Sequence, residues 1–137
     1  MGRILKGVTA GVAALILVAG CLGAAEATSR IQNLAALQYS GGEGLFVAFL
    51  WVSTNDRNLD ATIIVPHLSE ALHPIATYKF SGQVVFKFAA KGKGVQAAGE
   101  QIHALVTDLD PSNGITPPEN AIATCSPLGT QYFVCRQ

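Results

Sequence analysis

The sequence predicts an α+β domain, in which a small antiparallel sheet carries one amphipathic helix packed on a face. Three stretches of the chain lead to this prediction. Residues 45–52 are apolar without a break, residues 77–88 alternate apolar and polar side chains, and residues 95–109 space their apolar side chains as a helix does. An all-β sandwich, in which residues 95–109 only cross over, is the alternative.

The first predicted element is a short helix. Thr28 or Ser29 can cap its start, and the pair Gly41-Gly42 can end it. Between these signals the apolar residues follow a helical spacing: Ile31, Leu34 and Leu37.

Strands are predicted over four later segments. Residues 45–52 suit a central strand buried on both faces, and residues 61–65 form a strand rich in β-branched side chains. Residues 77–88 predict a hairpin around Ser81-Gly82, or one long strand with a bulge at that glycine. Residues 130–134 predict a final edge strand.

The amphipathic helix is predicted over residues 95–109. Its apolar side chains fall on one helical face: Val95, Ala98, Ile102, Leu105, Val106 and Leu109. Residues 108–118, which follow, are dense in Asp, Pro, Asn and Gly and therefore predict a loop.

The first 21 residues have the composition of an export signal. Arg3 and Lys6 precede an uncharged apolar run over residues 8–19, and Val18-Ala19-Gly20-Cys21 ends it. The run is shorter than the roughly 20 apolar residues of a transmembrane helix. Its last four residues resemble the lipobox of bacterial lipoproteins, and this resemblance implies that Cys21 is acylated and becomes the new N-terminus.

The chain therefore divides into a signal peptide over residues 1–20, a tether over residues 21–29 and one globular domain over residues 30–137. Cleavage after Ala27 is an alternative, because Ala25-Glu26-Ala27 also follows the small-x-small rule, and a retained anchor is another. Some bacteria sort lipoproteins by the residue that follows the acylated cysteine. Here this residue is Leu22 and not Asp, which in such bacteria implies a location in the outer membrane.

Two of the three cysteines form a predicted disulfide. With Cys21 acylated or removed, Cys125 and Cys135 remain as a pair around a short segment whose Pro and Gly suit a turn. Outside the cytoplasm their oxidation would close a small ring and contribute about 2 to 3 kcal/mol. Their spacing is not the CxxC of a redox pair.

Charge and hydropathy point to a folded domain that does not bind nucleic acid. Half of the residues are hydrophobic and 13% are charged, which argues against disorder. Without the leader, seven basic residues face nine acidic ones, a net charge of −2. The one local basic cluster contains Lys87, Lys91 and Lys93, and its aromatic neighbours occupy strand positions rather than a stacking platform.

One acidic loop resembles the calcium loop of the EF-hand family. Five oxygen-bearing positions match its first, third, fifth, seventh and twelfth places: Asp108, Asp110, Ser112, Gly114 and Glu119. Ile115 supplies the apolar eighth place. Asn113 stands where that family has glycine, and Pro117-Pro118 restricts an exit helix. The competing interpretation is a turn that ends the preceding helix without a metal.

Two other patterns give weaker evidence for a binding site. His67 and His73 bracket Glu70, but without His103 they are too few for a metal site, so surface histidines are expected. Residues 92–97 match GxGxxA, yet too little chain follows for a dinucleotide-binding sheet. The backbone amides of that segment, beside Lys91 and Lys93, leave an anion site as an alternative.

The chain contains no nucleophile elbow, zinc framework or P-loop pattern. The predicted function is therefore a small non-enzymatic envelope lipoprotein that binds a protein partner or gives structural support, with calcium as its one candidate cofactor. The first alternative is a secreted enzyme or inhibitor released after Ala27. The second is a pilus or matrix subunit, in which the strand at residues 45–52 completes a neighbour's sheet.

Overall fold

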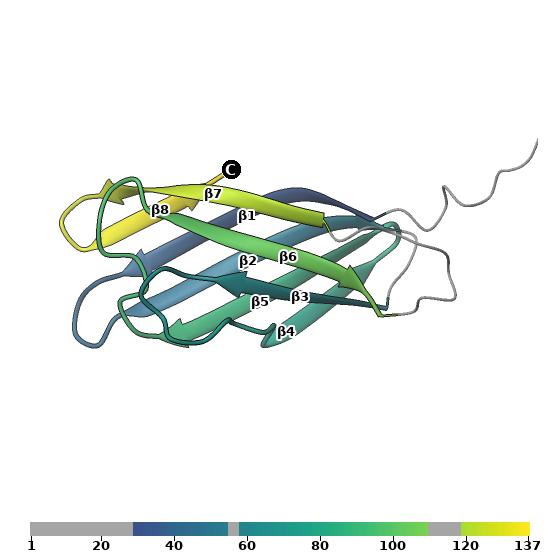
Figure 1. Cartoon of the computed structure of the whole chain (residues 1–137), viewed down its shortest axis with the longest axis horizontal. Coiled ribbons are helices and arrows are strands. Elements are labelled where there is room, and N and C mark those ends of the chain that lie inside the picture. Colours follow the sequence, from purple (N-terminus) through teal and green to yellow (C-terminus); the bar gives the residue numbers. More distant parts are fainter. Residues whose placement is uncertain (1–28, 55–57, 110–118) are drawn as a thin grey trace, which may run out of the picture. The chain divides into compact units, whose positions relative to one another are not determined.

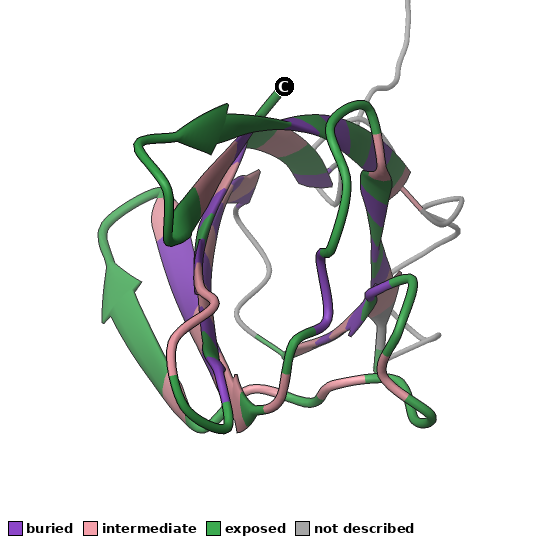
Figure 2. Ribbon diagram, turned by 90° about the vertical axis from the view of Figure 1, so that its left-hand side faces the viewer, coloured by how far each residue is buried: buried purple, intermediate pink, exposed green. Residues whose placement is uncertain are grey.

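The computed structural model describes residues 29–54, 58–109 and 119–137. These residues form eight strands: β1 (Ser29–Tyr39), β2 (Leu45–Thr54), β3 (Leu59–Ile64), β4 (Ala76–Phe80), β5 (Gln83–Lys91), β6 (Gln101–Asp108), β7 (Glu119–Leu128) and β8 (Tyr132–Arg136). All neighbouring strands are antiparallel and make one sheet in the order β3-β6-β7-β8-β1-β2-β5-β4 (Figure 1). The sheet curls into a half-barrel around the core (Figure 2).

The α+β prediction is wrong, because the described residues contain no helix. The all-β alternative gives the right class, although the strands belong to one curled sheet rather than to two packed sheets.

The predicted helix at residues 95–109 is a loop followed by β6. Gly99 adopts a left-handed backbone with φ of 88°, which interrupts any helix there. Beyond it Ile102 and Val106 are buried while Leu105 is exposed, so the side chains alternate as in a strand. Residues four apart share one face of a helix and also one face of a strand, and Ile102 and Val106 therefore fitted both patterns.

The predicted helix at the start of the domain is also wrong, because these residues form β1. Leu34 and Ala36 point into the core, whereas Leu37 is 41% exposed on the other side. β1 pairs with β2 along its length and with β8 over its second half, so its backbone hydrogen bonds are made across strands.

The predictions of strands agree better with the structure. β2, β3 and the β4-β5 hairpin around Gly82 confirm the segments at residues 45–52, 61–65 and 77–88. β2 is not buried on both faces, however, because Leu45 on its outer face is 44% exposed. β8 is not an edge strand, because it pairs with β7 on one side and β1 on the other.

The core lies inside the curl and is built from unequal contributions. β2 and β5 supply large side chains, among them Phe46, Phe86 and Phe88. β6 and β7 supply Ile102 and Val106 together with several small side chains, among them Ala104 and Ala123. Small side chains on one wall leave room for the aromatic rings of the other at ordinary packing density.

Candidate binding face

The outer surface of five adjacent strands, β8-β1-β2-β5-β4, is unusually apolar. Along β2 the inward side chains are fully buried, and the outward ones are also apolar: Leu45, Val47, Phe49 and Trp51. This is why residues 45–52 read as an unbroken apolar run. A strand with core on one side only normally alternates apolar with polar residues, so the outer side chains need another explanation.

The strand register places these outward side chains in rows that cross the sheet. We call their combined surface the aromatic face. Its rows are Tyr132-Tyr39-Leu45-Lys91, Val134-Leu37-Val47-Ala89, Arg136-Ala35-Phe49-Lys87-Ala76, Asn33-Trp51-Val85-Tyr78 and Arg30-Ser53-Gln83-Phe80. Apolar side chains on neighbouring strands therefore touch across the sheet rather than lying scattered.

Aromatic contacts join neighbouring positions of this face. The rings of Phe49 and Trp51 lie 5.8 Å apart, and the Nζ of Lys87 lies 5.9 Å from the centre of the Phe49 ring. At the end of the sheet with the β1-β2 turn, the rings of Tyr39 and Tyr132 are 5.2 Å apart. Such contacts hold the rings in place at the surface.

Two shallow hollows open on the same face. One has a volume of about 430 Å³ and is lined by Leu37, Tyr39, Leu45, Val47, Gln131 and Tyr132. Beside it lies one of about 400 Å³, which shares Tyr39 and Leu45 and adds Lys91 and Glu43 on its rim. These hollows have the size and apolar lining of sites that bind small apolar groups.

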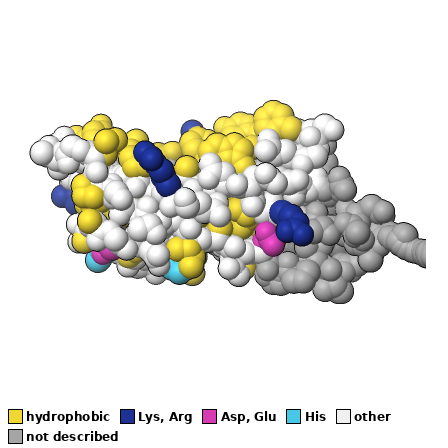
Figure 3. Space-filling view, turned by 90° about the horizontal axis from the view of Figure 1, so that it is seen from above, with side chains coloured by type: hydrophobic (Ala, Val, Ile, Leu, Met, Phe, Trp, Pro, Cys, Tyr) yellow, Lys and Arg dark blue, Asp and Glu magenta, His cyan; other side chains and the backbone are white. Residues whose placement is uncertain are grey.

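Charge is divided between the two parts of the sheet. The five strands of the aromatic face contain no Asp or Glu and five cations: Arg30, Lys79, Lys87, Lys91 and Arg136. The other three strands contain no Lys or Arg and three acids: Asp60, Asp108 and Glu119. In the view of Figure 3 hydrophobic side chains gather along the upper margin, with basic side chains among the patches.

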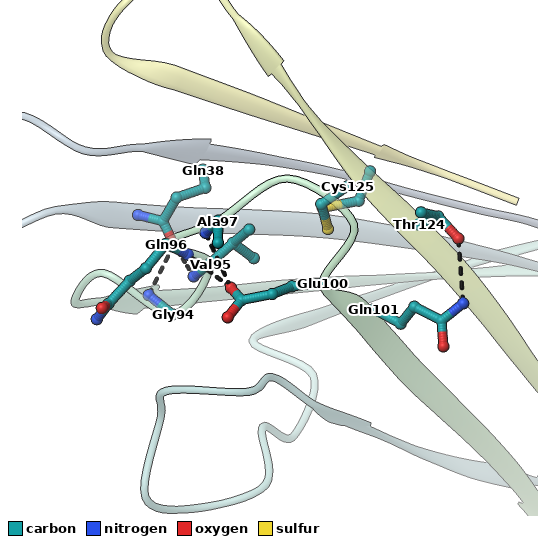
Figure 4. The surroundings of a disulfide bond; sticks show 10 residues. Gln38, Gly94, Val95, Gln96, Ala97, Glu100, Gln101, Thr124 and Cys125 are labelled. Atoms are coloured by element: carbon teal, nitrogen blue, oxygen red, sulfur yellow. Dashed lines mark hydrogen bonds between the residues drawn. A yellow bond between two sulfur atoms is a disulfide. The ribbon is translucent and has the colours of Figure 1, made fainter.

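The predicted disulfide between Cys125 and Cys135 is confirmed. Both cysteines are fully buried and face each other directly in the β7-β8 pair (Figure 4 shows its surroundings). The bond therefore joins the strand pair at which the acidic and basic parts of the sheet meet.

The glycine segment after β5 is held by a buried side chain that the sequence analysis missed. Gln38 is fully buried, and its Oε1 accepts hydrogen bonds from the N–H groups of Gly94 and Val95 at 2.8 and 3.1 Å (Figure 4). Its Nε2 donates to the carbonyl oxygen of Gly92 at 2.9 Å. Two of the amides that the anion hypothesis requires are thus already used.

The histidines are exposed, as expected, and one of them supports a loop. His67 Nε2 lies 2.6 Å from Glu100 Oε2, while Glu100 Oε1 accepts from the N–H groups of Gln96 and Ala97. The bonds from Gln96 and from His67 hold the pKa of Glu100 below its usual value. His73 and His103 do not join this pair, and the described residues contain no group of three metal-ligating side chains.

Two predicted sites lie wholly or partly outside the described residues. Cys21 lies there with the whole leader, and so do Asp110, Ser112 and Gly114 of the calcium loop. Asp108 ends β6 and Glu119 begins β7, so strands stand where an EF-hand has helices. Glu119 Oε1 accepts a hydrogen bond from the N–H of Ile31 at 3.0 Å. Calcium binding and acylation remain predictions.

Residues 29–54, 58–109 and 119–137 include no helix that is long and apolar enough to cross a membrane. No protein-family model matches the chain, and neither a curated protein nor a solved structure matches it.

Proposed function

We propose that this protein is an exported, non-enzymatic binding protein of the cell envelope that acts through its aromatic face. The observation that carries the proposal is the apolar outer surface of five neighbouring strands, four of which carry apolar side chains that are at least 40% exposed, whereas Val85 of β5 is buried between its neighbours. Large exposed apolar surfaces on folded domains mark binding sites, because leaving them in water promotes aggregation.

The hollows on this face suit binding. The larger of the two is lined by Leu, Val and Tyr side chains together with Gln131, and such a lining gains affinity from the burial of apolar area. The rims supply a few polar groups, including Lys91, which can orient a partner.

Export is supported by two independent features. The leader has the basic, apolar and small-residue regions of a secretion signal. The buried Cys125–Cys135 bond is of the kind that persists outside the cytoplasm. Acylation of Cys21 would then hold the protein at a membrane, and in a bacterium with two membranes Leu22 favours the outer one.

A second candidate function, a surface-assembly subunit, is favoured by the edge of the sheet. β2 cannot complete a neighbour's sheet, because it is paired on both sides. β4 is the last strand of the sheet and carries exposed Tyr78 and Phe80, so a neighbour's strand would add there.

The intact mass of the protein recovered from cell membranes tests export and anchoring. We expect a chain that begins at Cys21 with a diacylglyceryl group, and we expect Cys21→Ser to abolish both the cleavage before residue 21 and the lipid. An unmodified start at Thr28 would replace the lipoprotein by the secreted alternative. Full-length chain in the cytosol with reduced Cys125 and Cys135 would contradict export itself.

A further inference from the structure

We infer that the aromatic face docks on the surface of a bilayer that contains anionic lipids. The inference rests on the proposed function, since it names the partner of the same face. It does not depend on the lipid at Cys21, because the apolar and charged side chains that would contact the bilayer all belong to the described strands.

The apolar centre of the face matches the interfacial layer of a membrane. Phe49 and Trp51 occupy the middle strand, and Tyr78 and Phe80 extend the surface to the sheet edge, where they are 45% and 54% exposed. Trp and Tyr are the side chains that concentrate at membrane–water boundaries, because a ring and a polar tip suit the two environments together.

The cations lie where lipid headgroups would lie. In the rows across the sheet, Lys91, Arg136 and Arg30 stand at row ends, around the apolar centre. Lys87 alone stands within a row, next to Phe49, where its aliphatic stem can follow the ring while its ammonium reaches outward. Within the described residues, none of these cations pairs with a carboxylate.

The charge of the aromatic face favours an anionic bilayer over a second copy of the chain as its partner. A second copy docked through the same face would bring two patches of the same positive charge together, and the five strands carry no Asp or Glu to offset this charge. An anionic bilayer instead meets every one of the cations with opposite charge, and each basic side chain near such a surface strengthens binding.

The length of chain between Cys21 and β1 permits contact between the aromatic face and the membrane. β1 starts at Ser29, eight residues after Cys21, and eight extended residues reach about 28 Å. A lipid at Cys21 and a docked face on the same membrane are therefore compatible with the length of chain between them.

Trp51 allows a direct test, because it is the only tryptophan of the chain and lies in the centre of the face. The processed protein is mixed with vesicles of phosphatidylcholine and with vesicles that also contain phosphatidylglycerol. We expect a blue shift of the Trp51 emission that is strong only with phosphatidylglycerol and is reversed by high salt. No shift with either vesicle would overturn the inference.

Matched variants separate local from net charge. Lys87→Gln/Lys91→Gln is expected to weaken binding to the anionic vesicles about 30-fold, the effect of two basic side chains at a membrane surface. Gln101→Glu/Asn120→Glu changes net charge equally but on β6 and β7, where both residues are exposed, and is expected to change binding less than about threefold. Equal losses in the two variants would overturn the inference.

A variant of β4 and the oligomeric state of the protein also test the inference. Tyr78→Ser/Phe80→Ser alters exposed positions of β4, so the fold survives, and it is expected to weaken vesicle binding about tenfold. A lipid-free dimer with a shielded Trp51 would assign the face to a second copy and also overturn the inference. Neither result bears on the mass at Cys21, which judges the envelope proposal separately.

Discussion

The two parts of the curled sheet bury apolar side chains on their inner surface in the same way, but they carry different side chains on their outer surface. Inside, β2 of the group β8-β1-β2-β5-β4 and β7 of the group β3-β6-β7 both bury every second side chain. Outside, the first group carries aromatic rings and cations, whereas the second contains no aromatic residue. The exposed side chains of the second group include Ile64, Ile122 and Leu105, whose cross-strand neighbours include the polar residues His103 and Asn120, and Leu128, which lies beside Tyr132. Folding therefore requires only the inner pattern, and we propose that the outer aromatic residues serve a partner.

The largest expected effect separates the inner from the outer aromatic residues. Phe88→Ala removes a fully buried ring and should lower the free energy of unfolding by about 4 kcal/mol. Phe49→Ala, on the outer face of the neighbouring strand, should cost only about 1 kcal/mol, because its ring is partly in water already. Urea denaturation measures both, and equal costs would show that the outer rings build the fold.

The next largest loss of stability is expected in the loop that connects β5, a strand of the aromatic face, to β6 in the acidic part of the sheet. Gln38→Met leaves the N–H groups of Gly94 and Val95 without their acceptor and should cost about 3 kcal/mol in the same assay. Gln101→Met, on an exposed side chain, is the control and should cost about 0.5 kcal/mol or less. A stable Gln38→Met protein would mean that the loop is held by other contacts.

A smaller effect is expected where the two parts meet between β7 and β8. Replacing both partners, Cys125→Ala/Cys135→Ala, should cost about 2 to 3 kcal/mol, since the ring is short and the strands remain paired. Thermal melting of the oxidised, reduced and double-variant proteins measures it. An unchanged melting temperature after reduction would contradict a stabilising bond.

The smallest effect depends on pH. The pKa of Glu100 is lowered in the folded protein by its bonds from Gln96 and His67, so its ionised form stabilises the fold. This contribution is complete above the unfolded pKa of about 4.3 and is lost as the pH falls through the lower folded value. Glu100→Gln should therefore be less stable than the wild type at neutral pH, and the difference should vanish in acid, below the lowered folded pKa of Glu100. A stability difference that persists in acid would contradict the assignment.

Part of this architecture could be predicted from the sequence, because local patterns specify it. The disulfide followed from counting cysteines, and the β4-β5 hairpin followed from alternation around Gly82. The segment with Ile102 and Val106 was wrongly predicted as a helix, because a spacing of four suits both a helix and a strand. Only Gly99, with its left-handed backbone, distinguished them.

The aromatic face itself could not be predicted, for a physical reason. Phe49 and Trp51 read as core because an apolar run does not reveal whether one or two of its sides are covered. That depends on the long-range pairing of β2 with β1 and β5 in a single layer. The role of Gln38 was missed for a similar reason, since the amides of Gly94 and Val95 that it binds lie more than fifty residues away.

Lipid-borne quenching of tryptophan fluorescence tests the central claim most directly. Trp51 of the wild type is compared with an indole moved to the acidic part of the sheet by Trp51→Phe/Leu105→Trp, a position that is 39% exposed. With phosphatidylglycerol vesicles containing brominated lipid, we expect strong quenching of Trp51 and little quenching of the indole at position 105. Equal quenching at both positions, or stronger quenching at position 105, would contradict the account.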